Sequence, residues 1–225
     1  MQRTLGKTDA QIQQEVLQEL KWDSRVEETD VGVEVDQGVV TLTGAVTSYA
    51  KRLAAQEAAH RVSGVLDVAN DIQVKIPGTL ERTDTEIAQA IRRALEWDVL
   101  VAADRIQTTI EKGIVTLEGS VDFWYQREAA ERAVHNLSGV RQVTNKLVVS
   151  TPPIGPEAVK EAIEQTLERR AVRTAKHIQV AVHDGVATVS GAVHSWQEKQ
   201  AVLAAARFTQ GVQSIEDQLR IEPEA

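Results

Sequence analysis

A nine-residue glycine pattern occurs three times in this chain and constrains its fold more than any other feature. It reads DQGVVTLTG at residues 36–44, EKGIVTLEG at 111–119 and HDGVATVSG at 183–191. A third glycine follows in each copy, and all three glycines keep offsets of 75 and then 72 residues between copies. Such a period predicts one small unit repeated three times. The glycines that define it are Gly38, Gly44, Gly64, Gly113, Gly119, Gly139, Gly185, Gly191 and Gly211.

Each copy is predicted to open with an amphipathic helix. Thr8 or Asp9 is the expected N-cap in the first copy, and Thr83 or Asp84 in the second, while the third helix opens at Pro156. Apolar residues then recur at helical spacing. In the first copy they are Ile12, Val16, Leu17 and Leu20.

The segments around the glycines predict the rest of the unit. Alternating β-branched residues indicate two strands that are joined by a hairpin turn at the first glycine. The second glycine marks a bulge or a close backbone approach within the second strand. An Ala-rich helix follows, whose C′ position fits the third glycine, and a last strand spans residues 65–74, 140–149 or 212–221. The predicted fold class is α+β, as three tandem αββαβ sandwiches of two layers.

Prolines mark the boundaries between the copies. Pro77, Pro152, Pro153 and Pro156 all fall between the predicted units, and none lies inside a predicted strand. The expected domains are therefore residues 1–77, 78–152 and 153–225. A domain of this size buries only about 60% of its unfolded surface, so each is expected to be marginal alone.

Composition limits the possible partners. The formal net charge of −8 argues against general attraction to nucleic acid, and the lack of cysteine removes disulfides and thiolate metal sites. The N-terminus has no apolar segment of the kind a secretory signal needs, and no stretch approaches 18 consecutive apolar residues. We expect a soluble cytoplasmic protein for which peripheral membrane association stays possible.

The closing segment of each copy carries a recognisable motif, with a Gly-Val pair followed by a polar residue before the strand end. It stands as Gly64-Val65 with Asn70, Gly139-Val140 with Asn145, and Gly211-Val212 with Asp217. With the glycine pattern, this motif resembles the BON domain family (bacterial OsmY and nodulation) over nearly the whole chain. The resemblance implies a non-catalytic αββαβ module of osmotic-shock, transport-associated and envelope proteins, with phospholipid association as its usual proposed role. One branch of that family binds potassium in the cytoplasm.

An aromatic residue beside a cation recurs at the start of the second helix of each copy. Such a pair suits a bilayer interface, although the rings could instead cover the core edge or a contact between copies. A basic run in the third copy could likewise dock phosphate headgroups or an acidic partner, or form a solvated helix end. The candidate lipid-binding residues are Tyr49, Lys51, Arg52, Trp124, Arg127, Trp196, Lys199, Arg169, Arg170, Arg173 and Lys176.

No pattern in the chain predicts catalysis, a metal or a cofactor. His60 and His135 are equivalent to Arg207, which indicates helix C-terminal electrostatics rather than a metal ligand or a base. The glycine pairs lack the Gly-Lys-Ser/Thr ending of a phosphate-binding loop. Trp22 and Trp97 occupy equivalent positions in the first two copies.

These observations favour a non-enzymatic binding or scaffold protein. Its expected partner is a phospholipid surface or an envelope protein, under osmotic or other stress, and homo-oligomers are possible. Two alternatives stay open at this point. One is a cytoplasmic protein that binds or senses potassium, and the other is a chaperone that holds unfolded clients.

Overall fold

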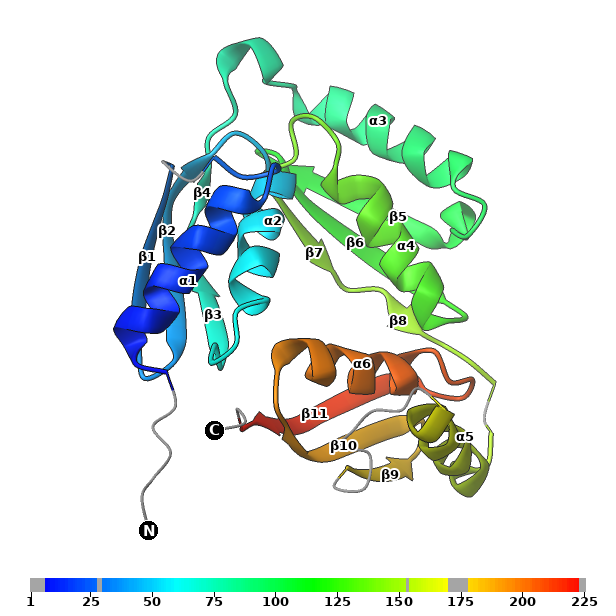
Figure 1. Ribbon diagram of the computed structural model, residues 1–225. Coiled ribbons are helices and arrows are strands. Elements are labelled where there is room, and N and C mark those ends of the chain that lie inside the picture. Colours follow the sequence, from blue (N-terminus) through cyan, green and yellow to red (C-terminus); the bar gives the residue numbers. More distant parts are fainter. Residues whose placement is uncertain (1–6, 28–29, 153, 170–177, 223–225) are drawn as a thin grey trace. The chain divides into compact units, whose positions relative to one another are not determined.

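A computed structural model describes residues 7–27, 30–152, 154–169 and 178–222 of the 225-residue chain. The first repeat contains α1 (Asp9–Trp22), β1 (Val31–Asp36), β2 (Val39–Val46), α2 (Tyr49–His60), β3 (Asp67–Asn70) and β4 (Gln73–Val74), as Figure 1 shows. The second contains η2 (Gly78–Leu80), α3 (Asp84–Trp97), η3 (Ala103–Arg105), β5 (Ile106–Glu111), β6 (Ile114–Val121), α4 (Trp124–His135), β7 (Gln142–Asn145) and β8 (Val148–Val149). The third contains α5 (Pro156–Arg169), β9 (Gln179–His183), β10 (Val186–Val193), α6 (Trp196–Arg207) and β11 (Ser214–Ile221). The predicted α+β class and the αββαβ order are confirmed.

The chain divides into two compact units. The first unit contains the first repeat together with Val193–Lys199 of the third, and the second unit contains the second repeat with most of the third. The predicted division into domains at residues 1–77, 78–152 and 153–225 stays a prediction.

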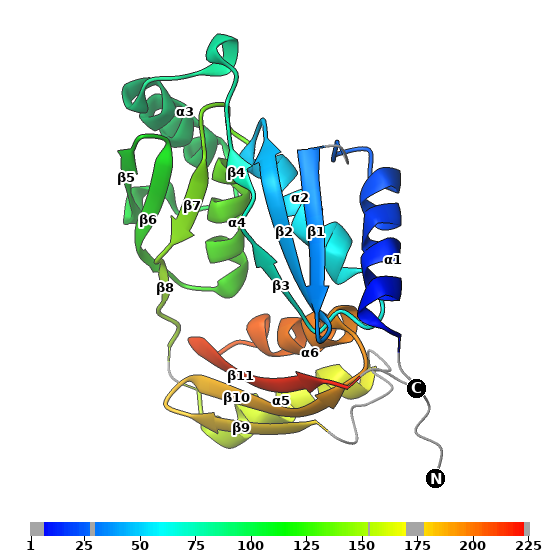
Figure 2. The same cartoon turned by 90° about the vertical axis from the view of Figure 1, so that its left-hand side faces the viewer.

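Each repeat builds its sheet around the central strand of the hairpin. In the first repeat β2 pairs antiparallel with β1 and parallel with β3, so the strand order is β1-β2-β3. The second repeat has the order β5-β6-β7, and the third β11-β10-β9. Helices α1 and α2 contact each other and the same sheet, and Figure 2 shows α2 behind the strands of that sheet. The helix pair of the first repeat therefore covers one face of its sheet.

The core lies between the helices and the sheet. On α1 the buried face is narrower than the sequence predicts, because Leu17 is exposed. Helix α2 contributes four small buried residues, which allow it to lie close against the strands. The buried side chains of the first repeat include Ile12, Val16, Leu20, Val40, Leu42, Ala54, Ala55, Ala58, Ala59, Val65 and Ile72.

The first glycine belongs to a hairpin turn, as predicted, and the structure shows that the turn has two residues. Gln37 and Gly38 both have positive φ, at 50° and 79°, and the flanking Asp36 and Val39 are register partners. A turn with two positive φ angles matches the right-handed twist of the strands it joins. All nine glycines of the repeated pattern have positive φ.

The second glycine marks a close backbone approach, which confirms one of the two predicted alternatives. Gly44 is opposite Val31, and the register runs without a break from that pair to the turn. A Cβ atom on Gly44 would lie 2.1 Å from the carbonyl oxygen of Asp30. Only glycine fits where the neighbouring strand comes this near.

Two predictions around the third glycine are wrong in detail. The C-cap of α2 is Arg61, so Gly64 lies three residues beyond it rather than at C′. Gly64 has a positive φ of 97°, and it packs against α1, because a Cβ there would lie 3.1 Å from the Cδ1 atom of Ile12. The predicted single closing strand is divided into β3 and β4 in the first repeat and into β7 and β8 in the second.

Candidate interaction surface

The three aromatic rings predicted to contact lipid have different degrees of burial. Tyr49 is buried, and the indole N–H of Trp124 is buried without an acceptor among the described residues. Trp196 stacks on His60, with the ring centroids 3.8 Å apart and the planes inclined by 7°. In the structure the three rings therefore pack against other parts of the protein. Their contact with lipid stays a prediction.

The neighbouring cations hold the second helix to the closing strand. Arg52 donates to the carbonyl oxygen of Asn70 at 2.7 Å, and Arg127 donates to that of Asn145 at 2.9 Å. The Arg127 guanidinium also lies 5.0 Å from the centroid of the Trp124 ring, and its burial lowers its pKa. Both arginines thus complete the hydrogen bonding of strand ends.

The other predicted cations are placed at the surface or lie outside the described residues. Lys51 pairs with Glu27, and the ammonium of Lys199 lies 5.9 Å from the centroid of the Trp196 ring. Arg169, at the end of α5, is exposed. Arg170, Arg173 and Lys176 belong to residues 170–177, which lie outside the described part of the chain.

An exposed apolar group lies at the end of α3 and directly after it in the second repeat. Trp97, Val99 and Leu100 have exposed fractions of 85%, 96% and 46%. We call these three residues the apolar tip. Asp98 fixes its shape, because its carboxylate accepts a hydrogen bond from the N–H of Leu100 at 2.9 Å.

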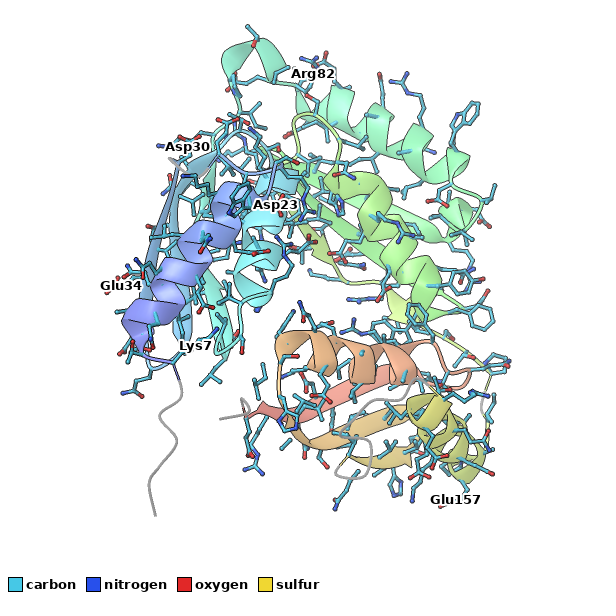
Figure 3. All side chains as sticks on the ribbon, viewed as in Figure 1. Lys7, Asp23, Asp30, Glu34, Arg82 and Glu157 are labelled. Carbon is cyan, nitrogen blue, oxygen red and sulfur yellow. The ribbon has the colours of Figure 1, made fainter. Side chains whose placement is uncertain are left out.

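The first repeat has the same turn, but it carries polar and charged side chains in place of apolar ones. Asp23 accepts from the N–H of Arg25 at 3.1 Å, as Asp98 does from that of Leu100. Asp23, labelled in Figure 3, also binds the guanidinium groups of Arg25 and Arg61 at 2.8 and 2.9 Å. The hydrogen bond from Arg25, more than any other contact, lowers the pKa of this carboxyl below its usual range. One repeat therefore presents ion pairs where the other presents the apolar tip.

A groove between α3 and the edge strand β5 lies beside the apolar tip. Its volume is about 700 Å³, and its lining includes Ala88, Arg92 and Thr108. In the first repeat Gln13 occupies the position of Ala88 and donates to the carbonyl oxygen of Val33 on β1 at 2.7 Å. The short side chain of Ala88 cannot make this bond, and the groove is open.

Sequence reasoning aligned Trp22 with Trp97 but missed the rest of the apolar tip. The available signal was the run Trp97 to Val101, in which the second repeat is apolar where the first has Ser24 and Arg25. Within the described residues, no group of three or more His, Asp or Glu side chains could hold a metal. None of the described helices has the length and apolar character that crossing a membrane requires.

The fold and these surfaces define a protein of three tandem αββαβ units. The chain belongs to the BON domain family, whose pattern it matches at residues 8–76, 83–151 and 157–223. It is 32% identical over 143 residues to osmotically-inducible protein Y of Escherichia coli (strain K12), a match that covers 62% of this chain and 71% of that protein.

Two solved structures of CdsD, a structural protein of the type III secretion system of Chlamydia trachomatis, also align with the chain. They are 14% and 13% identical to it, and the alignments cover 94% and 97% of this chain and 92% and 100% of theirs. The TM-score is 0.27 in both cases, which is too low for the likeness to bear on the fold.

Proposed function

We propose that this protein is a non-enzymatic peripheral membrane protein that associates with a phospholipid surface during osmotic stress through the apolar tip. The exposure of Trp97, Val99 and Leu100 is the observation that carries the proposal. Membership of the BON domain family and the likeness to an osmotically inducible protein support the link to osmotic stress.

The size of the tip fits a reversible anchor. Full burial of a large apolar side chain is worth about 1.5–3 kcal/mol, so three such side chains supply roughly 5 kcal/mol before the costs of association. An indole ring also favours the boundary between headgroups and acyl chains. Binding of this strength is reversible rather than permanent.

Charges near the apolar tip offset one another. The guanidinium of Arg92 lies 3.9 Å from the carboxylate of Glu96 in the next turn of α3. One guanidinium nitrogen of Arg105 donates to both carboxylate oxygens of Asp122, at 2.8 and 2.9 Å. Asp98 lies within the tip itself. Attraction to anionic headgroups should therefore contribute little here, and we expect binding that persists at high salt.

The aromatic and basic helix starts, together with Arg169 at the end of α5, are the alternative contact with the same surface. Lys51, Lys199 and Arg169 would act by charge, so binding through them would need anionic lipid and would weaken as salt is added. The two contacts therefore differ in salt dependence as well as in the residues they require.

The experiment is co-sedimentation of the full chain with vesicles of phosphatidylcholine, with and without phosphatidylglycerol, at 50 and 500 mM salt. We expect binding to both vesicle types at both salt concentrations, together with a blue shift of tryptophan emission. The variant with Trp97→Ser, Val99→Ser and Leu100→Ser should lose most of the binding. Trp22→Ser is the matched control, because Trp22 is 76% exposed at the equivalent position.

Two results would contradict the proposal. One is no co-sedimentation under any condition, and the other is unchanged binding by the triple variant. Loss of binding at 500 mM salt would instead indicate that the basic residues make the contact with lipid. The cytoplasmic location stays a prediction, which cell fractionation would test.

A further inference from the structure

The hairpin turns of the first two repeats are each closed by one carboxylate. The two oxygens of Asp9 accept hydrogen bonds from the N–H groups of Gln37 and Gly38, at 3.0 and 2.9 Å. Asp84 does the same for Lys112 and Gly113, at 2.9 and 3.0 Å. Each aspartate is the first residue of its helix, α1 or α3. We call this pair of turn N–H groups the turn cradle.

The third repeat keeps the turn cradle but not the carboxylate. Asp184 and Gly185 have φ angles of 46° and 77°, close to the values at Gln37 and Gly38. The position of Asp9 and Asp84 is taken by Pro156, the first residue of α5, which has no acceptor in its side chain. In the part of the chain that the structure describes, no side chain accepts a hydrogen bond from the N–H of Asp184 or Gly185.

The third turn is nevertheless held as the others are. The carbonyl oxygen of Gly185 accepts from the N–H of Gln213 at 2.7 Å, as that of Gly38 accepts from Leu66 at 2.9 Å. A pocket of about 470 Å³ lies at this point. Its lining includes Gly155, Pro156, His183, Asp184, Gly185 and Gln213.

We propose that this pocket on the third repeat binds a carboxylate group supplied from outside the repeat, on the N–H groups of Asp184 and Gly185. The same pair of N–H groups binds a carboxylate in both other repeats, which identifies the ligand chemistry independently of the pocket. The inference goes beyond membrane association and does not depend on it.

Nearby charges limit the strength of this site and select its ligand. His183 stands where the other repeats have Asp36 and Glu111, so one acid is removed next to the turn. Asp184 lines the pocket, and Glu157 lies in the first turn of α5, where Figure 3 labels it. These two acids oppose an anion. We therefore expect a monoanionic carboxylate, rather than a doubly charged phosphate, with a dissociation constant in the millimolar range.

The test is amide chemical-shift titration of the full chain with sodium acetate, against sodium chloride at equal ionic strength. The N–H signals of Asp184 and Gly185 should shift in a saturable way with acetate and not with chloride. The matched internal controls are Gln37, Gly38, Lys112 and Gly113, whose N–H groups are already bound to aspartate and should not respond.

Two variants test the role of the carboxylate, because one adds it to the third repeat and the other removes it from the second. Pro156→Asp should fill the third turn cradle, abolish the acetate response and raise Tm by a few degrees. Asp84→Ala should remove the carboxylate from the turn cradle of the second repeat, so that the N–H signals of Lys112 and Gly113 respond to acetate. The second variant keeps the test decisive if the first does not fold.

The source of the carboxylate is decided by dilution without acetate. Shifts of Asp184 and Gly185 that depend on protein concentration, and that Pro156→Asp removes, would identify an acid of a second copy of this chain. Saturable acetate shifts without concentration dependence would identify a free organic acid. If wild-type shifts are the same in acetate and chloride, or survive Pro156→Asp, the proposal is wrong.

Discussion

Arg52 and Asn70 exchange hydrogen bonds with each other's main chain. The guanidinium of Arg52 donates to the carbonyl oxygen of Asn70 at 2.7 Å, and the side-chain amide of Asn70 donates to the carbonyl oxygen of Arg52 at 3.1 Å. Arg127 and Asn145 repeat the exchange at 2.9 and 3.1 Å. The polar residue of the closing motif therefore joins the second helix to the strand that follows it.

Replacing this asparagine should destabilise its repeat. Asn70→Ala leaves the carbonyl oxygen of Arg52 and the N–H of Ile72 without their side-chain partner, and we expect a loss of about 1–3 kcal/mol. Urea denaturation measures the change. Asn136→Ala is the control, because Asn136 is exposed, and its effect should be below about 0.5 kcal/mol. Equal effects of the two substitutions would contradict the role given to Asn70.

The second glycine of each pattern should tolerate no side chain. Gly44→Ala would place a Cβ 2.1 Å from the carbonyl oxygen of Asp30 at a residue with φ of 118°. We expect a loss of more than about 3 kcal/mol, or failure to fold, because both strands must move. Gly78→Ala is the matched control, since nothing lies within 4 Å of its added Cβ, and its Tm should change little. A stable Gly44→Ala protein would show that the strands separate easily.

Stability should fall on mild acidification because of His60. Burial lowers the pKa of His60 from 6.5 to about 4, so the folded protein holds this ring neutral while the unfolded chain protonates it. The contribution of the neutral ring to stability is complete above pH 6.5 and is lost as pH falls towards 4. We expect a loss of about 2 kcal/mol between pH 7.5 and pH 5.

Urea unfolding at pH 7.5, 6 and 5 measures this loss. The variant His60→Phe keeps a flat ring to stack on Trp196 but cannot titrate, so most of the pH dependence in this window should disappear. If the stability of His60→Phe depends on pH as that of the wild type does, groups other than His60 cause the loss.

The open groove of the second repeat gives a paired prediction. Gln13→Ala removes the hydrogen bond to the carbonyl oxygen of Val33 and should cost about 0.5–1.5 kcal/mol. Ala88→Gln should form the equivalent bond to Thr108 on β5 and leave stability unchanged or slightly higher. Thermal unfolding compares the two variants. Destabilisation by Ala88→Gln of more than about 1 kcal/mol would show that the two repeats differ in backbone geometry at this position.

The sequence by itself determined the repeat, the element order and the family. Positive φ at Gly38 follows from the hairpin turn that its neighbours require, and the apolar spacing of Ile12, Val16 and Leu20 sets the buried face of α1. These features depend on residues close together along the chain. They are local consequences of backbone sterics and side-chain periodicity.

Only the tertiary structure decided which polar and aromatic groups are accessible. Tyr49 and Trp97 are both aromatic residues at helix ends, yet one is buried and the other 85% exposed. The partners of Arg52 and of Asp9 lie 18 and 28 or more residues away in the sequence. Burial and hydrogen bonding depend on which distant segments meet when the helices pack on the sheet, and spacing along the chain does not contain that information.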